Sequence, residues 1–141
     1  MTTEEKELLL KDLCARLPYG VKVLDNSHKD YGVSKLINIG VDGSILIDNE
    51  INDIQYYPII DEVKPYLRTL ESITEEEKNE IESLGWRVDE LDNNHPWAHN
   101  GEIESVLAGI KWLIEHHFDF LGLIPLGLAI EVINENNPYK D

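Results

Sequence analysis

The sequence predicts an α+β domain: an N-terminal helix, an antiparallel β-meander of three to five strands, and two further helices packed on the sheet. An apolar helical stripe precedes Pro18, short β-rich runs fill residues 21–57, and two more helical patterns follow Thr74. The 141 residues, 42% of them hydrophobic, are enough to bury one core. We therefore expect a single domain over residues 1–141, with 134–141 frayed.

The first helix has both a start and a stop in the sequence. Thr2 and Glu5 have the spacing of a capping box, and the ring of Pro18 disfavours helical geometry at the residue before it. Cys14 falls on the apolar side, so we expect a buried and inert thiol rather than a nucleophile. The apolar positions that recur at helical intervals are Leu9, Leu10, Leu13, Cys14 and Leu17.

Residues 21–57 have the pattern of a meander. The clearest turn is Asp42-Gly43, which lies between two apolar runs and favours a tight hairpin because both residues tolerate positive φ. Alternation along the second strand predicts one face in the core and one partly wet. The expected strands cover residues 21–24, 33–39, 45–47 and 53–57, the last stopped by Pro58.

The second half of the chain predicts two helices. Thr74 is a helix cap followed by three glutamates, whose negative charge the helix dipole favours by about 0.3–1 kcal/mol each. The dipole thus explains part of the acidity without any function. The expected elements are an extended segment at 64–68, a helix from Thr74 to Gly85, a short strand at 86–88, a helix from Asn100 to His116-His117 with its stripe at Ile103, Val106, Leu107, Ile110, Leu113 and Ile114, and a last strand at 128–133.

The charge of the chain is its most informative property. The formal net charge is −16, and residues 71–104 alone hold eleven carboxylates against two cations. Such a charge repels the phosphates of nucleic acids, whose binding relies on Lys and Arg. We therefore expect no direct binding of DNA or RNA, and a basic partner for any electrostatic contact.

Composition also limits the compartment. Cys14 is the only cysteine, so the chain forms no internal disulfide. The N-terminus opens with acids rather than a basic region, which predicts no signal peptide. The most apolar stretch, residues 118–133, is interrupted by charged residues, Gly and Pro, and predicts core rather than a membrane span. These features predict a cytoplasmic protein without membrane contact.

Three segments carry a likeness to known sequences: residues 4–21, residues 59–68 together with 72–78, and residues 116–129. They resemble a family of small uncharacterised proteins from gut bacterial genomes and their mobile elements, a family without an assigned activity. The resemblance implies a small bacterial protein. It implies no catalytic residue and no cofactor.

A metal site is the one catalytic alternative that the sequence leaves open. His95 and His99 are four residues apart and, with Glu102 as a third ligand, could bind a metal ion if they shared a helical face. Pro96 is accepted only at the start of a helix, which aims the side chain of His95 poorly. No Glu follows His95 to complete the zinc-protease motif. The alternative function is a metal-dependent hydrolase.

The leading hypothesis is a non-enzymatic domain that binds another protein through an acidic surface, with an exposed tryptophan as anchor. No catalytic residue and no cofactor are assigned, and the oligomeric state stays open. The expected surface residues are Glu75, Glu76, Glu80, Asp89, Glu90, Trp86 and Trp97.

Overall fold

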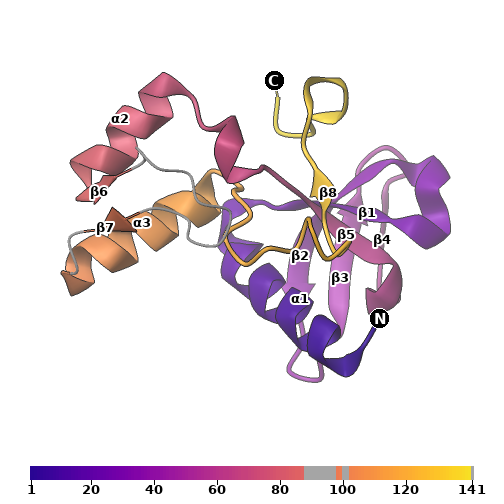
Figure 1. The fold of residues 1–141 in the computed structure, drawn as a ribbon. Coiled ribbons are helices and arrows are strands. Elements are labelled where there is room, and N and C mark those ends of the chain that lie inside the picture. Colours follow the sequence, from indigo (N-terminus) through magenta and orange to yellow (C-terminus); the bar gives the residue numbers. More distant parts are fainter. Residues whose placement is uncertain (88–97, 100–101, 141) are drawn as a thin grey trace.

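The computed structural model describes residues 1–87, 98–99 and 102–140 of the chain. A mixed six-stranded sheet with the N-terminal helix against it forms one part of the molecule, and two helices lie side by side next to it (Figure 1). The predicted α+β class is confirmed.

The sheet has the strand order β4-β3-β2-β1-β5-β8. Its first four strands form the predicted meander, and Asp42-Gly43 connects β2 to β3 with Gly43 at φ 85°. All neighbours are antiparallel except β5 and β8, which pair in parallel. The strands are β1 Lys22–Asp25, β2 Val33–Ile39, β3 Ile45–Asn49, β4 Ile54–Tyr56, β5 Val63–Leu67 and β8 Ile130–Glu131.

Helix α1 (Thr3–Arg16) begins at the capping box expected from Thr2 and Glu5. It covers the inner face of the sheet with a stripe of Leu9, Asp12, Leu13 and Arg16. Cys14 is exposed, so the expectation of a buried thiol is wrong. Each residue advances about 100° around a helix, which carries Cys14 past the stripe that contains Leu13.

Buried and more exposed residues alternate along the strands of the sheet. On β2 the buried side holds Ser34 and Leu36, while Lys35 points to the outer face. A bulge between Leu36 and Asn38 changes the register toward the hairpin. The core consists of Leu9, Leu13, Val21, Val23, Leu36, Ile45, Ile47, Val63, Leu67, Leu123, Leu128 and Ala129.

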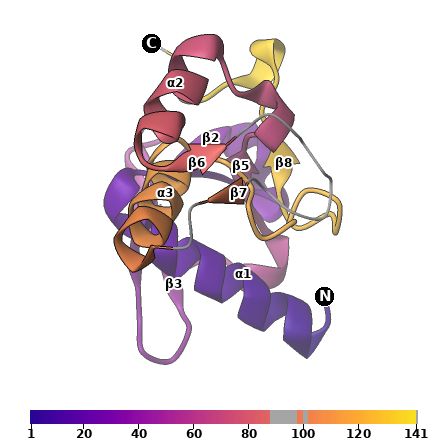
Figure 2. The ribbon, with the colours of Figure 1, turned by 60° about the vertical axis from the view of Figure 1, so that its left-hand side comes forward.

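The second part of the molecule, which we call the helical lobe, consists of α2 (Glu75–Ser83), β6 (Trp86–Arg87), β7 (Ala98–His99) and α3 (Ile103–Glu115). Both helices keep their places beside each other when the molecule is turned (Figure 2). The lobe has its own core, separate from that of the sheet. This core consists of Ile81, Trp86, Trp112, Leu113 and Phe118.

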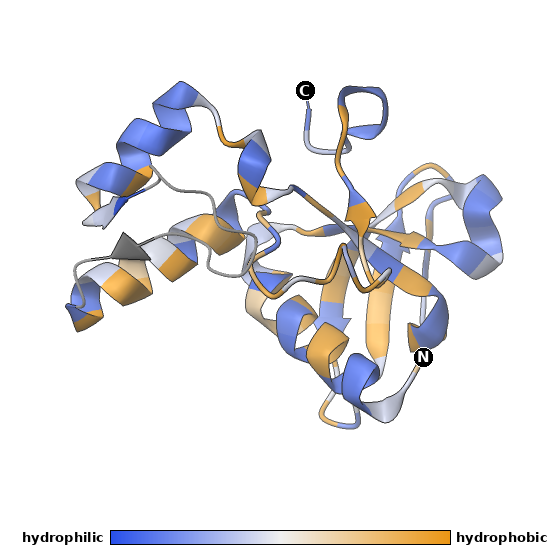
Figure 3. Ribbon diagram, in the orientation of Figure 1, coloured by the Kyte–Doolittle hydropathy of each residue, from blue (hydrophilic) through white to orange (hydrophobic). Residues whose placement is uncertain are grey.

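The side of α3 that is buried differs from the side that its apolar pattern predicts. Gly109 and Trp112 are buried, whereas Ile103 and Leu107 are 76% and 62% exposed. Gly109 lies directly against the indole of Trp86, and this contact fixes which side of α3 faces inward. Apolar residues therefore remain on the outside of the lobe, and Figure 3 shows the apolar positions along α3. Within residues 1–87, 98–99 and 102–140, no helix has the length and apolar character of a membrane span.

The C-terminal segment is docked rather than frayed. The Tyr139 hydroxyl accepts a hydrogen bond from Lys22 N at 2.9 Å and donates one to Tyr66 O at 2.8 Å. Val23 pairs with Pro65, so Lys22 and Tyr66 are the next residues of the β1–β5 ladder. The phenol thus takes the place of one ladder hydrogen bond. The expectation of fraying over 134–141 is wrong for this residue.

Replacement of Gly109 by alanine should destabilise the helical lobe. The added methyl group would overlap the Trp86 indole, and overpacking of this kind costs about 1–3 kcal/mol. Urea unfolding followed by tryptophan fluorescence measures the loss. Lys111→Ala on the exposed side of α3 is the matched control, and equal stability of Gly109→Ala and the wild type would contradict the packing of Trp86 on α3.

Candidate functional site

The exposed carboxylates of α2 are the part of the predicted acidic surface that the structure describes. Thr74 and Glu77 form a capping box at the start of the helix, as the sequence predicts for Thr74. Ile81 is the buried residue of this helix, while Glu77, Lys78 and Glu82 are half-buried. The predicted surface residues on this helix are all exposed: Glu75, Glu76 and Glu80.

Glu77 has a different role from its neighbours. Its two carboxylate oxygens accept hydrogen bonds from Arg68, each at 2.7 Å. Burial acts to raise the pKa of Glu77, but the hydrogen bonds from Arg68 and Thr74 lower it to about 2. Glu77 is therefore an ionised structural residue that fastens α2 to the end of β5.

Glu75 and Glu76 carry their charge without a partner in the described part of the chain, where no ion pair includes them. Glu80 differs, because it accepts a hydrogen bond from Trp112 Nε1 at 3.0 Å and lies 3.7 Å from His116 Nε2. The rings of Trp112 and His116 stack with centroids 4.1 Å apart. The acidic face of α2 thus continues into an aromatic pair on α3.

Trp86 is not the exposed anchor that the sequence predicts. It is 5% exposed, it packs on Gly109, and its Nε1 donates to Ser105 O at 2.7 Å. The short strand β6 turns the indole inward because α3 offers a glycine-sized gap there. The other residues predicted for this surface, Asp89, Glu90 and Trp97, lie outside the described residues.

Ile103 and Leu107 are the surface residues that sequence reasoning missed. Their spacing places them one above the other on the same side of α3, and both are largely exposed. The pattern assigned them to the core, because periodicity identifies an apolar stripe without showing what covers it. The helical lobe therefore presents unpaired carboxylates on one helix and an apolar pair on the other.

The predicted metal ligands are only partly described. His99 lies in β7 opposite Trp86, and Glu102 directly precedes α3. His95 lies outside the described residues. Within the parts of the chain that are described, no three His, Cys, Asp or Glu side chains gather as a metal site would require. The metal-site alternative stays a prediction.

A buried charge centre lies where the helical lobe joins the sheet. Arg16 is fully buried, its Nε donates to Asp12 Oδ2 at 2.8 Å, and its Nη2 donates to Phe118 O. Asp119, next to Phe118, accepts from two backbone amides of the following turn. Burial raises the pKa of Asp12, while the nearby guanidinium acts to lower it. These contacts tie α1 to the segment that follows α3.

His117 ends α3 in an unusual conformation. Its amide donates to Ile114 O and the next amide donates to Leu113 O, which is a Schellman motif with histidine at the left-handed position, φ 65°. Glycine is the usual residue there. The imidazole stacks on the Tyr139 ring at 3.6 Å, and its buried Nδ1 has no hydrogen-bond partner among the described residues. The side chain, rather than the backbone, explains why histidine occupies this position.

Loss of the Arg16 charge should destabilise the protein strongly. Arg16→Met leaves the Asp12 carboxylate buried and unpaired, and removal of one partner of a buried pair costs about 3–5 kcal/mol. Adding Asp12→Leu to this variant removes the lone charge and should recover part of the loss. Urea unfolding of the wild type, single and double variants measures both steps. A double variant no more stable than Arg16→Met would contradict the role of the pair.

His117 should make stability depend on pH between about 6.5 and 4. Burial, and then the positive charges of Arg16, His116, Arg68 and Lys22, lower the pKa of His117 to about 4 from its ordinary 6.5. The unfolded chain therefore binds the proton more readily, so the stability contributed by His117 is complete above pH 6.5 and is lost as the pH falls toward 4.

His117→Asn tests this, because asparagine tolerates the left-handed conformation and does not titrate. The pH slope of the unfolding free energy between pH 7 and pH 4.5 should be shallower for His117→Asn than for the wild type. His116 is one of the groups that lower the pKa of His117, so His116→Asn is measured beside it and should change the slope less than His117→Asn does. Parallel slopes for the wild type and His117→Asn would contradict the assignment.

No protein-family model, no curated protein and no solved structure matches this chain. The functional argument therefore depends on the residues of the chain itself, and the helical lobe is their clearest candidate surface.

Proposed function

We propose that the protein is a non-enzymatic domain that binds a basic protein partner through its helical lobe. The observation that carries this proposal is the combination of Glu75 and Glu76, exposed and without ion pairs in the described residues, with the exposed apolar pair Ile103 and Leu107 on the adjacent helix. Neither feature alone distinguishes an interface from an ordinary surface.

The two features supply the two kinds of contact that protein binding uses. Acidic side chains speed the approach of a basic partner and select it by charge. Apolar side chains that become covered on binding supply affinity. The helix dipole explains Glu75 and Glu76 in the first turn, but Glu80 lies beyond that turn. The dipole therefore does not account for Glu80, which instead accepts the hydrogen bond from Trp112.

The net charge of −16 also limits the class of molecule that can be the partner. It disfavours direct contact with nucleic acid and favours a protein rich in Lys and Arg, such as a nucleic-acid-binding protein. The resemblance to proteins of gut bacterial genomes and mobile elements implies a small bacterial protein, and we propose as its partner a nucleic-acid-binding protein that a mobile element encounters. We propose no catalytic residue and no cofactor for this function.

The experiment begins with capture of the partner from the native host and continues with its affinity for purified variants. Glu75→Gln combined with Glu76→Gln should weaken binding about 2- to 30-fold, because each exposed charge contributes about 0.2–1 kcal/mol. The affinity of the wild type should fall steeply as salt rises. Leu107→Ser should weaken binding and leave the salt dependence unchanged.

The matched control is Glu4→Gln combined with Glu7→Gln, which removes the same charge from exposed positions on α1. It should bind like the wild type at equal salt. An affinity insensitive to salt, or an equal loss in the control, would exclude the helical lobe as the binding surface.

A further inference from the structure

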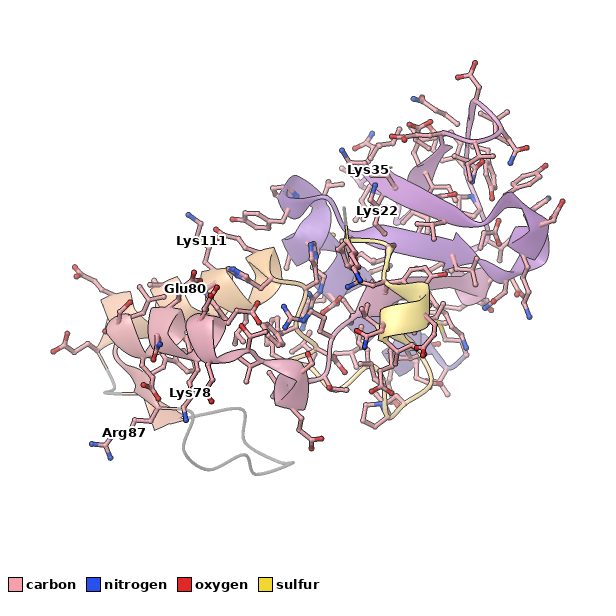
Figure 4. The ribbon with its side chains drawn as sticks, turned by 90° about the horizontal axis from the view of Figure 1, so that it is seen from above. Lys22, Lys35, Lys78, Glu80, Arg87 and Lys111 are labelled. Carbon is pink, nitrogen blue, oxygen red and sulfur yellow. The ribbon has the colours of Figure 1, made fainter. Side chains whose placement is uncertain are left out.

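A row of charged residues crosses the outer face of the sheet. The register places Lys22 of β1 directly opposite Lys35 of β2, and Lys35 directly opposite Asp48 of β3. Successive residues of a strand point to opposite faces, so this row lies on the side away from α1, whose partners include Val23 and Leu36. Figure 4 shows Lys22 and Lys35 on the sheet, and Glu80 and Lys111 on the helical lobe.

Two lysines in directly opposed positions repel each other. Like charges at such positions destabilise a sheet, whereas opposite charges stabilise it. Lys64 of β5 points to the same face, because its cross-strand neighbour is Leu24, two residues along from Lys22. This face therefore concentrates positive charge on three adjacent strands of a chain whose net charge is −16.

These lysines are free of the ion pairs that other lysines make. Lys6 pairs with Asp61 and Lys111 pairs with Glu115. Within the described residues, no ion pair includes Lys22, Lys35 or Lys64. A carboxylate placed between Lys22 and Lys35 would remove their repulsion and give both ammonium groups a partner.

The row borders a shallow groove of about 220 Å³. Val33, Ile51 and Pro138 give it apolar walls, so an aliphatic side chain can lie beside the bound carboxylate. Asp48 and Glu50 close the end away from Lys22 and would repel a polyanion. The groove thus selects an isolated carboxylate over a phosphate chain.

We propose that this groove, the lysine groove, is a second binding surface, which takes a peptide segment of a partner that carries a glutamate or aspartate next to aliphatic residues. The surface is separate from the helical lobe, so this inference does not depend on the proposed function. At physiological ionic strength charges more than about 8 Å away are largely screened, which lets a positive groove act locally on an acidic protein.

The test uses the full chain labelled with ¹⁵N and a capped synthetic peptide of sequence Ala-Val-Glu-Val-Ala, titrated in an NMR experiment. The amides of Lys22, Val33, Lys35 and Asp48 should shift with a common saturation curve. The same peptide with Gln in place of Glu should bind at least 5-fold more weakly. The absence of shifts at these amides, or equal binding of the two peptides, would overturn the proposal.

Variants separate the groove from general charge effects. Lys22→Gln with Lys35→Gln should lose at least 5-fold in affinity for the peptide. Lys11→Gln with Lys29→Gln removes the same charge from exposed positions elsewhere and should bind as the wild type does. Thermal unfolding checks that the groove variant is folded. We expect it to fold, because the substitutions remove the repulsion between the two lysines. Equal losses in both pairs would overturn the assignment of the groove.

Two further results decide between ligand classes and between the two surfaces. Asp48→Asn with Glu50→Gln should raise the affinity for inorganic phosphate, because these acids repel it in the wild type. A wild type that binds phosphate better than the peptide would overturn the choice of a carboxylate ligand. Glu75→Gln with Glu76→Gln should leave peptide binding unchanged, so failure of the helical lobe and failure of the groove are distinguishable.

Discussion

The structure depends on one buried charge, the guanidinium of Arg16. A charge removed from water is costly unless hydrogen bonds and an opposite charge compensate it. Asp12 supplies the opposite charge from the preceding turn of α1, and the Phe118 carbonyl supplies an acceptor from the segment after α3. Because those partners come from α1 and from the segment where the helical lobe joins the sheet, Arg16 gains the Phe118 acceptor only when the two parts of the molecule are in place, and its Nη1 has no hydrogen-bond partner among the described residues. The Asp12–Arg16 pair lies within α1, so the hydrogen bond to Phe118 O is the contact that couples the two parts.

A second arginine, Arg68, also contacts Phe118 where the helical lobe meets the sheet, and we call this contact region the joint. Arg68 lies 4.2 Å from the centroid of the Phe118 ring and holds Glu77 with both ends of its guanidinium. The acidic segment therefore contains carboxylates with two physical roles. Glu77 is a fixed part of the joint, and its low pKa reflects that environment, whereas Glu75 and Glu76 face solvent with their charge unshared. A count of acids along the sequence merges these roles, and only the position of Arg68 separates them.

The sequence predicted the elements whose cause is local. The capping box at Thr2, the helix cap at Thr74, the Asp42-Gly43 turn and the strand at 33–39 all follow from residues within a few positions of one another. It failed where the cause is distant. Trp86 is buried because Gly109 leaves room for its indole. Tyr139 is docked because its hydroxyl bridges the Lys22 amide and the Tyr66 carbonyl, on two neighbouring strands. The lysine groove was equally hidden, because the opposition of Lys22 and Lys35 is set by strand register rather than by any pattern in either strand.

The placement of Tyr139 between β1 and β5 has a consequence for how the chain reaches its native state. The Tyr139 hydroxyl bonds to Lys22, which lies 117 positions earlier in the sequence. Strand β8 pairs with β5, which lies more than sixty positions earlier. Contacts of such long range require large loops to close first, and chains rich in them fold slowly. The contacts between β1 and β2, and between α2 and β6, join near neighbours and can form early. We therefore expect the pairing of β8 with β5 and the docking of Tyr139 to form last, and to be the last contacts protected from hydrogen exchange during refolding.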